Sequence, residues 1–145
     1  MKNTFRCKCP ITSALDIIGD KWSLVVIKQM LFEGKSTFKD FVESPEAIAT
    51  NILTARLKML EEFGIVKKEK HPTNKKTKIY ILTEKGLAFT PMLLELTLWS
   101  RDNIQEFNPG LNIDFNLEQV EKDKAKGAQY VIDHYNDFKN QLLSA

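Results

Sequence analysis

The sequence predicts a mainly α-helical (α+β) fold with one small β-hairpin and a C-terminal helical extension, and three observations support this prediction. Within residues 48–66, Leu53, Leu57 and Leu60 recur at the spacing of one buried helix face. Two strand-like runs, separated by the polar tip HPTNKK, follow at once. Apolar residues return at helical intervals in residues 117–143. A helix followed directly by a hairpin is the layout of a winged helix-turn-helix.

The composition is that of a soluble globular protein. Of the 145 residues, 43% are hydrophobic and 28% are charged. No apolar run approaches the ~20 residues of a membrane span, and the first residues lack the apolar stretch of a secretory signal. We therefore expect a cytoplasmic protein with no membrane association. The break at Asn108-Pro109-Gly110 divides the chain into a winged helix-turn-helix domain (residues 1–107) and a helical C-terminal extension (residues 108–145).

Two helices are predicted before residue 35. Apolar positions predict a helix over Ile11–Ile18, which Gly19 stops. Asp20 is then a suitable N-cap for a second helix. Apolar residues cover most of the circumference of this second helix up to Gly34, so we expect it to be the central core helix.

The next residues lead into the long helix that precedes the hairpin. We expect Lys35-Ser36-Thr37 to form a short strand that backs the hairpin, and Phe38 to Val42 to form a brief helix. Ser44-Pro45-Glu46 is the predicted turn, because the residue before a proline resists the helical region. The long helix is expected to end at Gly64, since glycine suits a helix C-cap.

A further helical segment is predicted to begin near Thr83, with a short helix, a kink near Pro91 and then a longer piece to about Phe107. Roughly half of its surface is apolar, and one domain core cannot cover both sides. A partner chain is the natural cover, and the chain's own tail is the alternative. The helical tail over residues 117–143 packs either on its own domain or across a dimer, and the sequence leaves both open.

The charges are unevenly distributed along the chain. Residues 66–82 carry six lysines and one glutamate, a net charge of +5, although the whole chain carries only +2. Residues 1–10 carry +3 and residues 108–145 carry −2. Such clustering is typical of a surface that contacts phosphates. For the lysine run alone, an ordinary solvated hairpin is the alternative.

Polar residues form a separate face of the long helix, with a width that fits a DNA major groove. The predicted base-edge contacts are Thr50, Asn51 and Thr54. Asparagine can bond adenine bidentately, and threonine can bond a base or touch a thymine methyl. The predicted phosphate and backbone contacts are Arg56 and Lys58 on the same helix, Lys75 and Lys76 at the hairpin tip, and Lys35 and Ser36. Arg56 has Glu46 and Asp40 as alternative, intramolecular partners.

The N-terminal segment holds both cysteines. Cys9 precedes a predicted helix and has Lys8 and Arg6 beside it, a setting that can lower the pKa of a thiol and make it reactive. A partly buried structural cysteine is the alternative. Cys7 is either the resolving thiol or pairs with Cys9 between protomers, since an intrachain bond between them would be strained.

A set of motifs with family spacing runs through the chain. The motifs are Cys9-Pro10, LDIIGDKW (15–22), Phe38-Lys39-Asp40-Phe41, ILTARLKMLEEFGIV (52–66), Tyr80-Ile81-Leu82-Thr83, Gly86, Pro91 and Trp99. Residues 9–100 thereby resemble the HxlR-type winged helix-turn-helix family of bacterial transcription regulators. The resemblance implies a homodimeric, sequence-specific regulator of double-stranded DNA, which we expect to be a repressor without a cofactor. It also implies dimer contacts through the N-terminal helix and the helix after the hairpin, and a sensing role for Cys9 toward a small electrophile or oxidant.

The chain departs from the family pattern at three places. Ala49 stands where the family usually has a serine at the start of the long helix. A missing N-cap side chain costs roughly 1 kcal/mol, and Thr50 or Ser44 is the expected substitute. Thr37 stands where a basic residue often precedes the phenylalanine, which weakens the expectation of one backbone contact. The tail extends beyond the usual family length, so the resemblance implies nothing about it.

Other classes of function have less support. We expect no enzyme, because the sequence has no phosphate-binding loop, HExxH motif, nucleophile elbow or paired-carboxylate pattern. We expect no metal site, because two cysteines and the distant His71 and His134 lack the paired spacing of zinc ligands. A winged-helix module for protein–protein contacts, without DNA binding, is the main alternative. The basic hairpin and the polar helix face argue against it.

Overall fold

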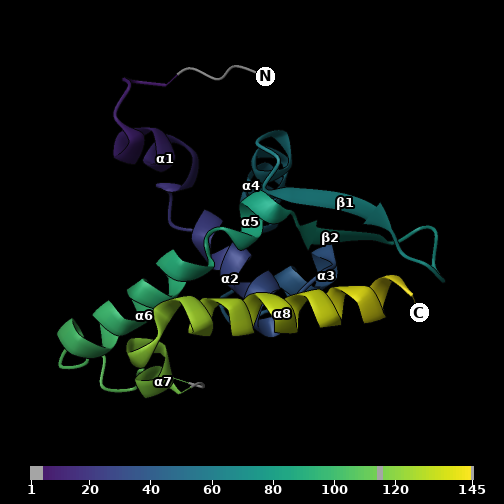
Figure 1. The fold of residues 1–145 in the computed structure, drawn as a ribbon. Helices are drawn as coiled ribbons and strands as arrows, with labels where there is room; N and C mark the ends of the chain where they lie inside the picture. Colours follow the sequence, from purple (N-terminus) through teal and green to yellow (C-terminus); the bar gives the residue numbers. More distant parts are fainter. Residues whose placement is uncertain (1–4, 114–115, 145) are drawn as a thin grey trace.

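In the computed structural model, which describes residues 5–113 and 116–144, helices pack against one two-stranded antiparallel hairpin, whose tip projects away from them (Figure 1). In chain order the elements are α1 (Pro10–Ile18), α2 (Ser23–Glu33), α3 (Phe38–Val42), α4 (Thr50–Glu62), β1 (Val66–Lys70), β2 (Lys78–Leu82), α5 (Glu84–Leu87), α6 (Thr90–Asn103), α7 (Leu117–Lys122) and α8 (Lys124–Leu143). The predicted fold class is confirmed. Within the described residues, no helix has the length and apolar character needed to cross a membrane.

The main core lies around α2. Val26, Ile27 and Met30 have no exposed surface, as expected for a central helix. The three leucines of α4 at helical spacing pack in the same cluster, together with residues of both strands. Burying a side chain of this size stabilises the fold by about 1.5–3 kcal/mol relative to leaving it exposed. The helix that precedes the hairpin is therefore anchored to the main core by its apolar face, and its polar face points outward.

The second helix begins later than predicted. Asp20 is not its N-cap residue, because Trp22 occupies that position without a side-chain hydrogen bond. The carboxylate of Asp20 instead accepts hydrogen bonds from the backbone N–H groups of Trp22 and Ser23, at 2.8 and 3.0 Å, and from the Ser23 hydroxyl. Asp20 thus closes the turn between α1 and α2, and α2 starts only at Ser23. Gly34, with φ of 67°, ends the helix as predicted.

Gly64 ends α4 in the predicted way. Its φ of 72° lies in the left-handed region, which favours glycine. The Gly64 N–H donates to the Glu61 carbonyl at 3.0 Å, and the Ile65 N–H donates to the Leu60 carbonyl at 2.9 Å. These two bonds form a Schellman motif, so the chain leaves the helix directly into β1.

The predicted strand over residues 35–37 does not form. Thr37 and Asp40 make a capping box at the start of α3, and the Asp40 carboxylate accepts the backbone N–H groups of Ser36 and Thr37, each at 3.0 Å. Because these two N–H groups are engaged, the segment cannot extend the sheet as a strand. It contributes a single bond to β2, from the Tyr80 N–H to the Ser36 carbonyl oxygen at 2.7 Å.

The segment after the hairpin forms the predicted short helix and longer helix, but these are two separate helices rather than one kinked helix. Thr83 caps α5 as predicted, since its hydroxyl accepts the Gly86 N–H at 3.4 Å. The helix stops at Leu87, and α6 starts anew with Pro91 in its first turn, where the missing N–H is tolerated. It ends at Asn103, short of the predicted end near residue 107.

The tail packs on the chain's own domain, which answers the question that the sequence left open. Leu94 and Leu98 of α6 are buried against residues of α7 and α8. Helix α8 then passes across α2, where Tyr135 enters the main core (Figure 1). A break that the sequence did not predict separates α7 from α8. At this break the Asp123 side chain caps α8 by accepting the Lys126 N–H at 3.0 Å.

Candidate nucleic-acid interface

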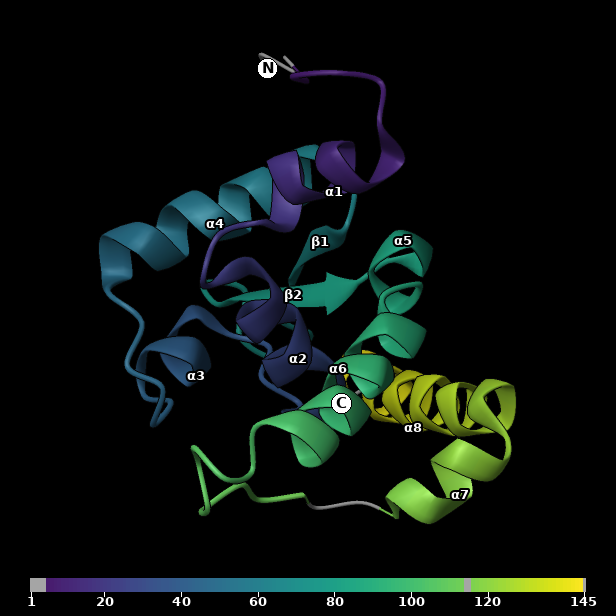
Figure 2. The same cartoon turned by 90° about the vertical axis from the view of Figure 1, so that its left-hand side faces the viewer.

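The polar face of α4 is open to solvent. Four of the predicted contact residues on it are exposed: Thr50, Asn51, Thr54 and Lys58. Figure 2 shows α4 along one edge of the molecule, on the side opposite to α7 and α8, so the tail does not cover this face. The Thr54 hydroxyl donates to the Thr50 carbonyl oxygen at 2.8 Å, and its oxygen keeps the capacity to accept a hydrogen bond.

The start of α4 has no side-chain cap. Ala49 is the N-cap residue, and neither Thr50 nor Ser44 replaces the missing side chain. The Ser44 hydroxyl is engaged elsewhere, because it accepts from Gln29 Nε2 at 2.6 Å. The expected substitution of the cap by Thr50 or Ser44 is therefore wrong. The first N–H groups of the helix remain available where a phosphate would approach.

Arg56 pairs with a residue that was not among its expected partners. Its Nη1 lies 3.4 Å from Asp20 Oδ1, rather than next to Glu46 or Asp40. Partial burial opposes ionisation of Asp20, but hydrogen bonds from Ser23 and Trp22 and the charge of Arg56 hold the pKa of this carboxyl below its ordinary value. The pair ties α4 to the turn between α1 and α2, and Arg56 lies beside the exposed polar face rather than on it.

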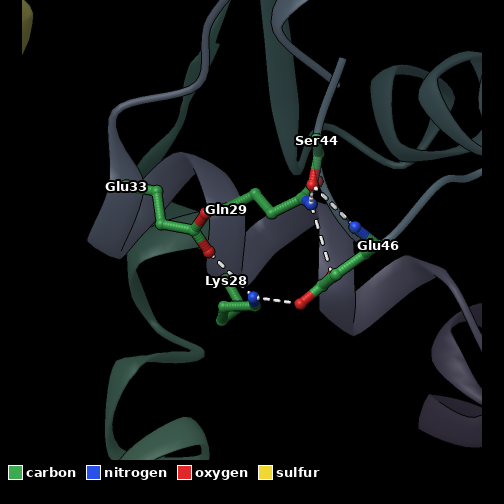
Figure 3. A network of polar contacts seen from close by, with 5 residues as sticks. All are labelled: Lys28, Gln29, Glu33, Ser44 and Glu46. Carbon is green, nitrogen blue, oxygen red and sulfur yellow. Dashed lines mark hydrogen bonds and ion pairs between the residues drawn. The ribbon is translucent and has the colours of Figure 1, made fainter. Parts of the chain in front are cut away.

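A polar network holds the turn that leads into α4 (Figure 3). Gln29 of α2 is buried, and its Nε2 donates to Ser44 Oγ and, at 3.3 Å, to Glu46 Oε2. Lys28 Nζ reaches Glu33 at 2.8 Å and Glu46 at 2.5 Å. Burial opposes the charge of Lys28, but these two carboxylates raise its pKa.

This network is a site that the sequence analysis missed. It fixes a turn in which Ala47 adopts φ of 54°, in the left-handed region that non-glycine residues seldom occupy. Gln29 was the available signal, since it is a polar residue within the largely apolar stretch of residues 24–32. A polar side chain at such a position needs partners, and its partners lie directly before α4.

The hairpin, or wing, ends in an ordered basic tip. The N–H groups of Thr73 and Asn74 both donate to His71 Nδ1 at 3.2 Å, and the Lys76 N–H donates to Asn74 Oδ1 at 3.2 Å. Lys75 and Lys76 are both exposed at this tip. The role of the imidazole as acceptor for the turn was not predicted. The wing therefore presents its lysines from a defined turn.

The two remaining predicted contacts to the DNA backbone, Ser36 and Lys35, differ in their exposure. Ser36 is only 6% exposed, and its N–H and carbonyl oxygen are both engaged within the chain, so its prediction as a DNA contact is not supported. Lys35 is half-buried. Partial burial opposes ionisation of Asp40. The N–H groups of Ser36 and Thr37 and the charge of Lys35 outweigh this effect and hold the pKa of the Asp40 carboxyl below its ordinary value.

Both cysteines are free and exposed at the start of α1. Cys9 is the N-cap residue of this helix. Hydrogen bonds from the backbone N–H and the hydroxyl of Thr12, and from the Ile11 N–H, hold the pKa of the Cys9 thiol below its ordinary value. The expected neighbour Arg6 is not a cause, because it forms an ion pair with Asp16 at 2.5 Å. Lys2 of the basic N-terminal segment lies outside the described residues.

An exposed polar helix next to a basic, ordered hairpin defines a winged-helix protein that binds duplex DNA. The comparison with family models agrees: residues 17–108 match the model described as HxlR-like helix-turn-helix, and the chain belongs to this family. It is a DNA-binding transcriptional regulator, and a module limited to protein contacts is not favoured.

Several relatives carry the same description. The chain is 34% identical over 93 residues to the HTH-type transcriptional regulator YodB of Bacillus subtilis. The matched region covers 63% of this chain and 82% of YodB. It is 34% identical over 95 residues to YybR of the same organism, covering 66% and 75% of the two chains. The reduced form of the redox regulator HypR superposes with a TM-score of 0.59 at 31% identity, covering 70% of this chain and 99% of HypR.

Proposed function

We propose that this regulator binds DNA as a homodimer, reads base edges with Thr50, Asn51 and Thr54 of α4, and contacts phosphates with Lys58 and the wing lysines. The observation that carries the proposal is the exposed polar face of α4 beside the basic wing. The test is an electrophoretic shift with DNA from upstream of the protein's own gene, followed by footprinting. A dimer should protect two half-sites one or two helical turns apart, ~34–36 Å per turn.

Exposed apolar side chains support the homodimer. On α1, Ile11 is 73% exposed and Leu15 is 51% exposed. On α6, Leu96 is 45% and Trp99 is 56% exposed, although the tail covers the other face of this helix. Both helices lie on the side of the molecule that faces the viewer in Figure 2. Single exposed apolar residues are ordinary, but a group of them on one side is typical of an interface.

The replacement Asn51→Ala tests the assignment of the base-reading face. We expect it to relax sequence preference at one base pair by about 1–3 kcal/mol, because the amide that bonds a base edge is lost. Affinities for the footprinted duplex and for single-base variants of it measure this effect. Asn140→Ala is the matched control, since Asn140 is an exposed residue of α8. If Asn51→Ala kept both affinity and preference, α4 would not be the reading helix.

We further propose that Cys9 makes DNA binding responsive to oxidants or electrophiles. Its exposed thiol at a helix N-terminus, with a lowered pKa, is a suitable nucleophile. The relatives add support, because YodB has been solved after diamide treatment and with bound quinone, and HypR in oxidised and reduced forms. In this chain, the Cys9 thiol would form a disulfide with Cys7 or Cys9 of a second copy, and the oxidant would take up the two electrons and the two protons of the thiols.

Diamide treatment of the wild type and of Cys9→Ser tests this proposal. DNA affinity of the wild type should change by about tenfold or more after treatment, a usual size for coupling between two sites. The Cys9→Ser protein should keep the same affinity with and without diamide, because no thiolate is present at the N-cap. Equal affinities in all four samples would remove redox control while leaving DNA binding intact.

A further inference from the structure

The outer edge of β2 is closed by two different parts of the chain. β1 pairs with one edge of β2, and the N–H groups of Tyr80 and Leu82 point to the other edge. The Tyr80 N–H donates to the Ser36 carbonyl oxygen, as described above. The Leu82 N–H, two residues further, donates to the hydroxyl oxygen of Tyr135 at 2.8 Å. A residue of the C-terminal extension therefore occupies the place where a further strand would bond.

Tyr135 is firmly held in this place. It is only 3% exposed and belongs to the main core cluster. Its ring lies 6.3 Å from that of Phe138, and a Cβ atom at Gly34 would come within 3.2 Å of the Phe138 ring, so α8 packs closely on the end of α2. Burial raises the pKa of the Tyr135 hydroxyl, which therefore stays protonated at neutral pH. The family match ends at residue 108, so this contact belongs to a segment that the family does not define.

A small change in the orientation of the wing at its base produces a large displacement of its tip. A two-stranded hairpin is only marginally stable alone and depends on what it packs against. The strand from Leu82 to Lys78 spans about 13 Å, so a tilt of about 10° at Leu82 moves Lys78 by about 2 Å, and the tip lysines by more. That displacement exceeds the ~0.5 Å range of N–H···O distances in hydrogen bonds.

We propose that Tyr135 is a positioning residue for DNA binding: through its bond to Leu82, the C-terminal extension sets the direction in which the wing presents Lys75 and Lys76 to the phosphate backbone. The inference rests on the proposed DNA contacts of the wing and adds a role for residues 109–145. Tyr135 itself touches no DNA in this account. It acts only through the backbone of β2.

The test is a double-mutant cycle with Tyr135→Phe, Lys75→Ala and the double variant, in the full-length protein. Tyr135→Phe removes one oxygen atom and keeps the ring, and Tyr130→Phe on the exposed face of α8 is the matched control. The probe is a labelled duplex of mixed sequence, since affinity for such DNA depends on phosphate contacts. Binding is measured over a range of salt concentrations, and exchange of the Leu82 amide hydrogen is followed in parallel.

We expect Tyr135→Phe to weaken binding about fivefold, the effect of one lost hydrogen bond. Lys75→Ala should lower the salt slope by about one. The double variant should bind no more weakly than the weaker of the two single variants, because both changes remove the same wing contact. Leu82 should exchange faster in Tyr135→Phe, and Tyr130→Phe should match the wild type in every measurement.

Two results would overturn the inference while the proposed function stands. One is wild-type affinity in Tyr135→Phe together with faster exchange at Leu82, which would make the bond structural only. The other is a pair of losses that simply multiply in the double variant. A wild-type protein that bound no duplex at any salt concentration would instead overturn the proposed function, and the inference with it.

Discussion

Replacing Trp99 by glutamate is expected to give a folded monomer that has lost most of its affinity for operator DNA. Trp99 is more than half exposed on α6, so the substitution removes little from the core, and glutamate is a good helix former. A glutamate at this position of the proposed dimer surface would be desolvated when the two copies associate, which is costly. Because tethering two half-site contacts raises affinity by about 10²–10⁴, operator binding should fall about 100-fold or more.

Sedimentation velocity and titration of the footprinted operator check this expectation together. Tyr130→Glu is the control, because Tyr130 is 73% exposed on α8 and lies outside the proposed dimer surface. It should keep the wild-type assembly and affinity. A Trp99→Glu protein that still sedimented as a dimer and bound normally would place the dimer contacts elsewhere on the molecule.

Tyr135→Ala is expected to lower the free energy of unfolding by about 3–5 kcal/mol, the usual loss when a buried aromatic side chain is truncated. The substitution opens a cavity between α8 and the main core and leaves the Leu82 N–H without its acceptor. Since domains are typically stable by about 5–15 kcal/mol, this is a large share of the total. The loss is expected to be this large because the C-terminal extension shares the core of the DNA-binding domain.

Urea denaturation of the two proteins measures this loss. Tyr130→Ala changes the same residue type on the same helix, five positions earlier, and should shift the unfolding free energy by no more than about 0.5 kcal/mol. Similar midpoints for the two alanine variants would mean that α8 contributes no more to stability on its buried side than on its exposed side.

Sequence reasoning succeeded where the pattern is local. Helix α4 and the wing were predicted because leucine spacing, a terminal glycine and two strand-like runs around a polar tip each act within a few positions. Gly64 illustrates this, since its role in ending the helix was inferred from its place after the last apolar residue, and its φ of 72° agrees with that role. The exposure of Thr50, Asn51 and Thr54 followed from the same periodicity.

The errors concern partners that are distant in sequence or competing local bonds. Arg56 was expected to contact phosphate, with Glu46 or Asp40 as its alternative partners. Those two carboxylates are engaged by Lys28 and by backbone N–H groups, and Asp20 is the one within reach. The predicted strand over residues 35–37 does not form, because the Asp40 carboxylate of the capping box accepts the N–H groups that a strand would use. A one-dimensional pattern carries no information about such competition.

The tail shows a different limit of prediction from the sequence. Its apolar spacing predicted a helix, but an amphipathic helix does not specify which surface it covers. Nothing in the neighbourhood of Tyr135 in the sequence indicates that its hydroxyl meets a backbone N–H group 53 positions away. The break at Asp123 was missed for a simpler reason, since aspartate is tolerated within helices as well as at their ends.

The closed edge of β2 also bears on aggregation. Open strand edges recruit strands from other molecules, and proteins blunt them with covering segments or with lysines. Here Ser36 and Tyr135 satisfy two outward N–H groups of β2, while β1 bears Lys67, Lys68 and Lys70 along the opposite rim. The sheet therefore offers other chains a poorer template for strand pairing, which favours contacts between copies through the helical faces.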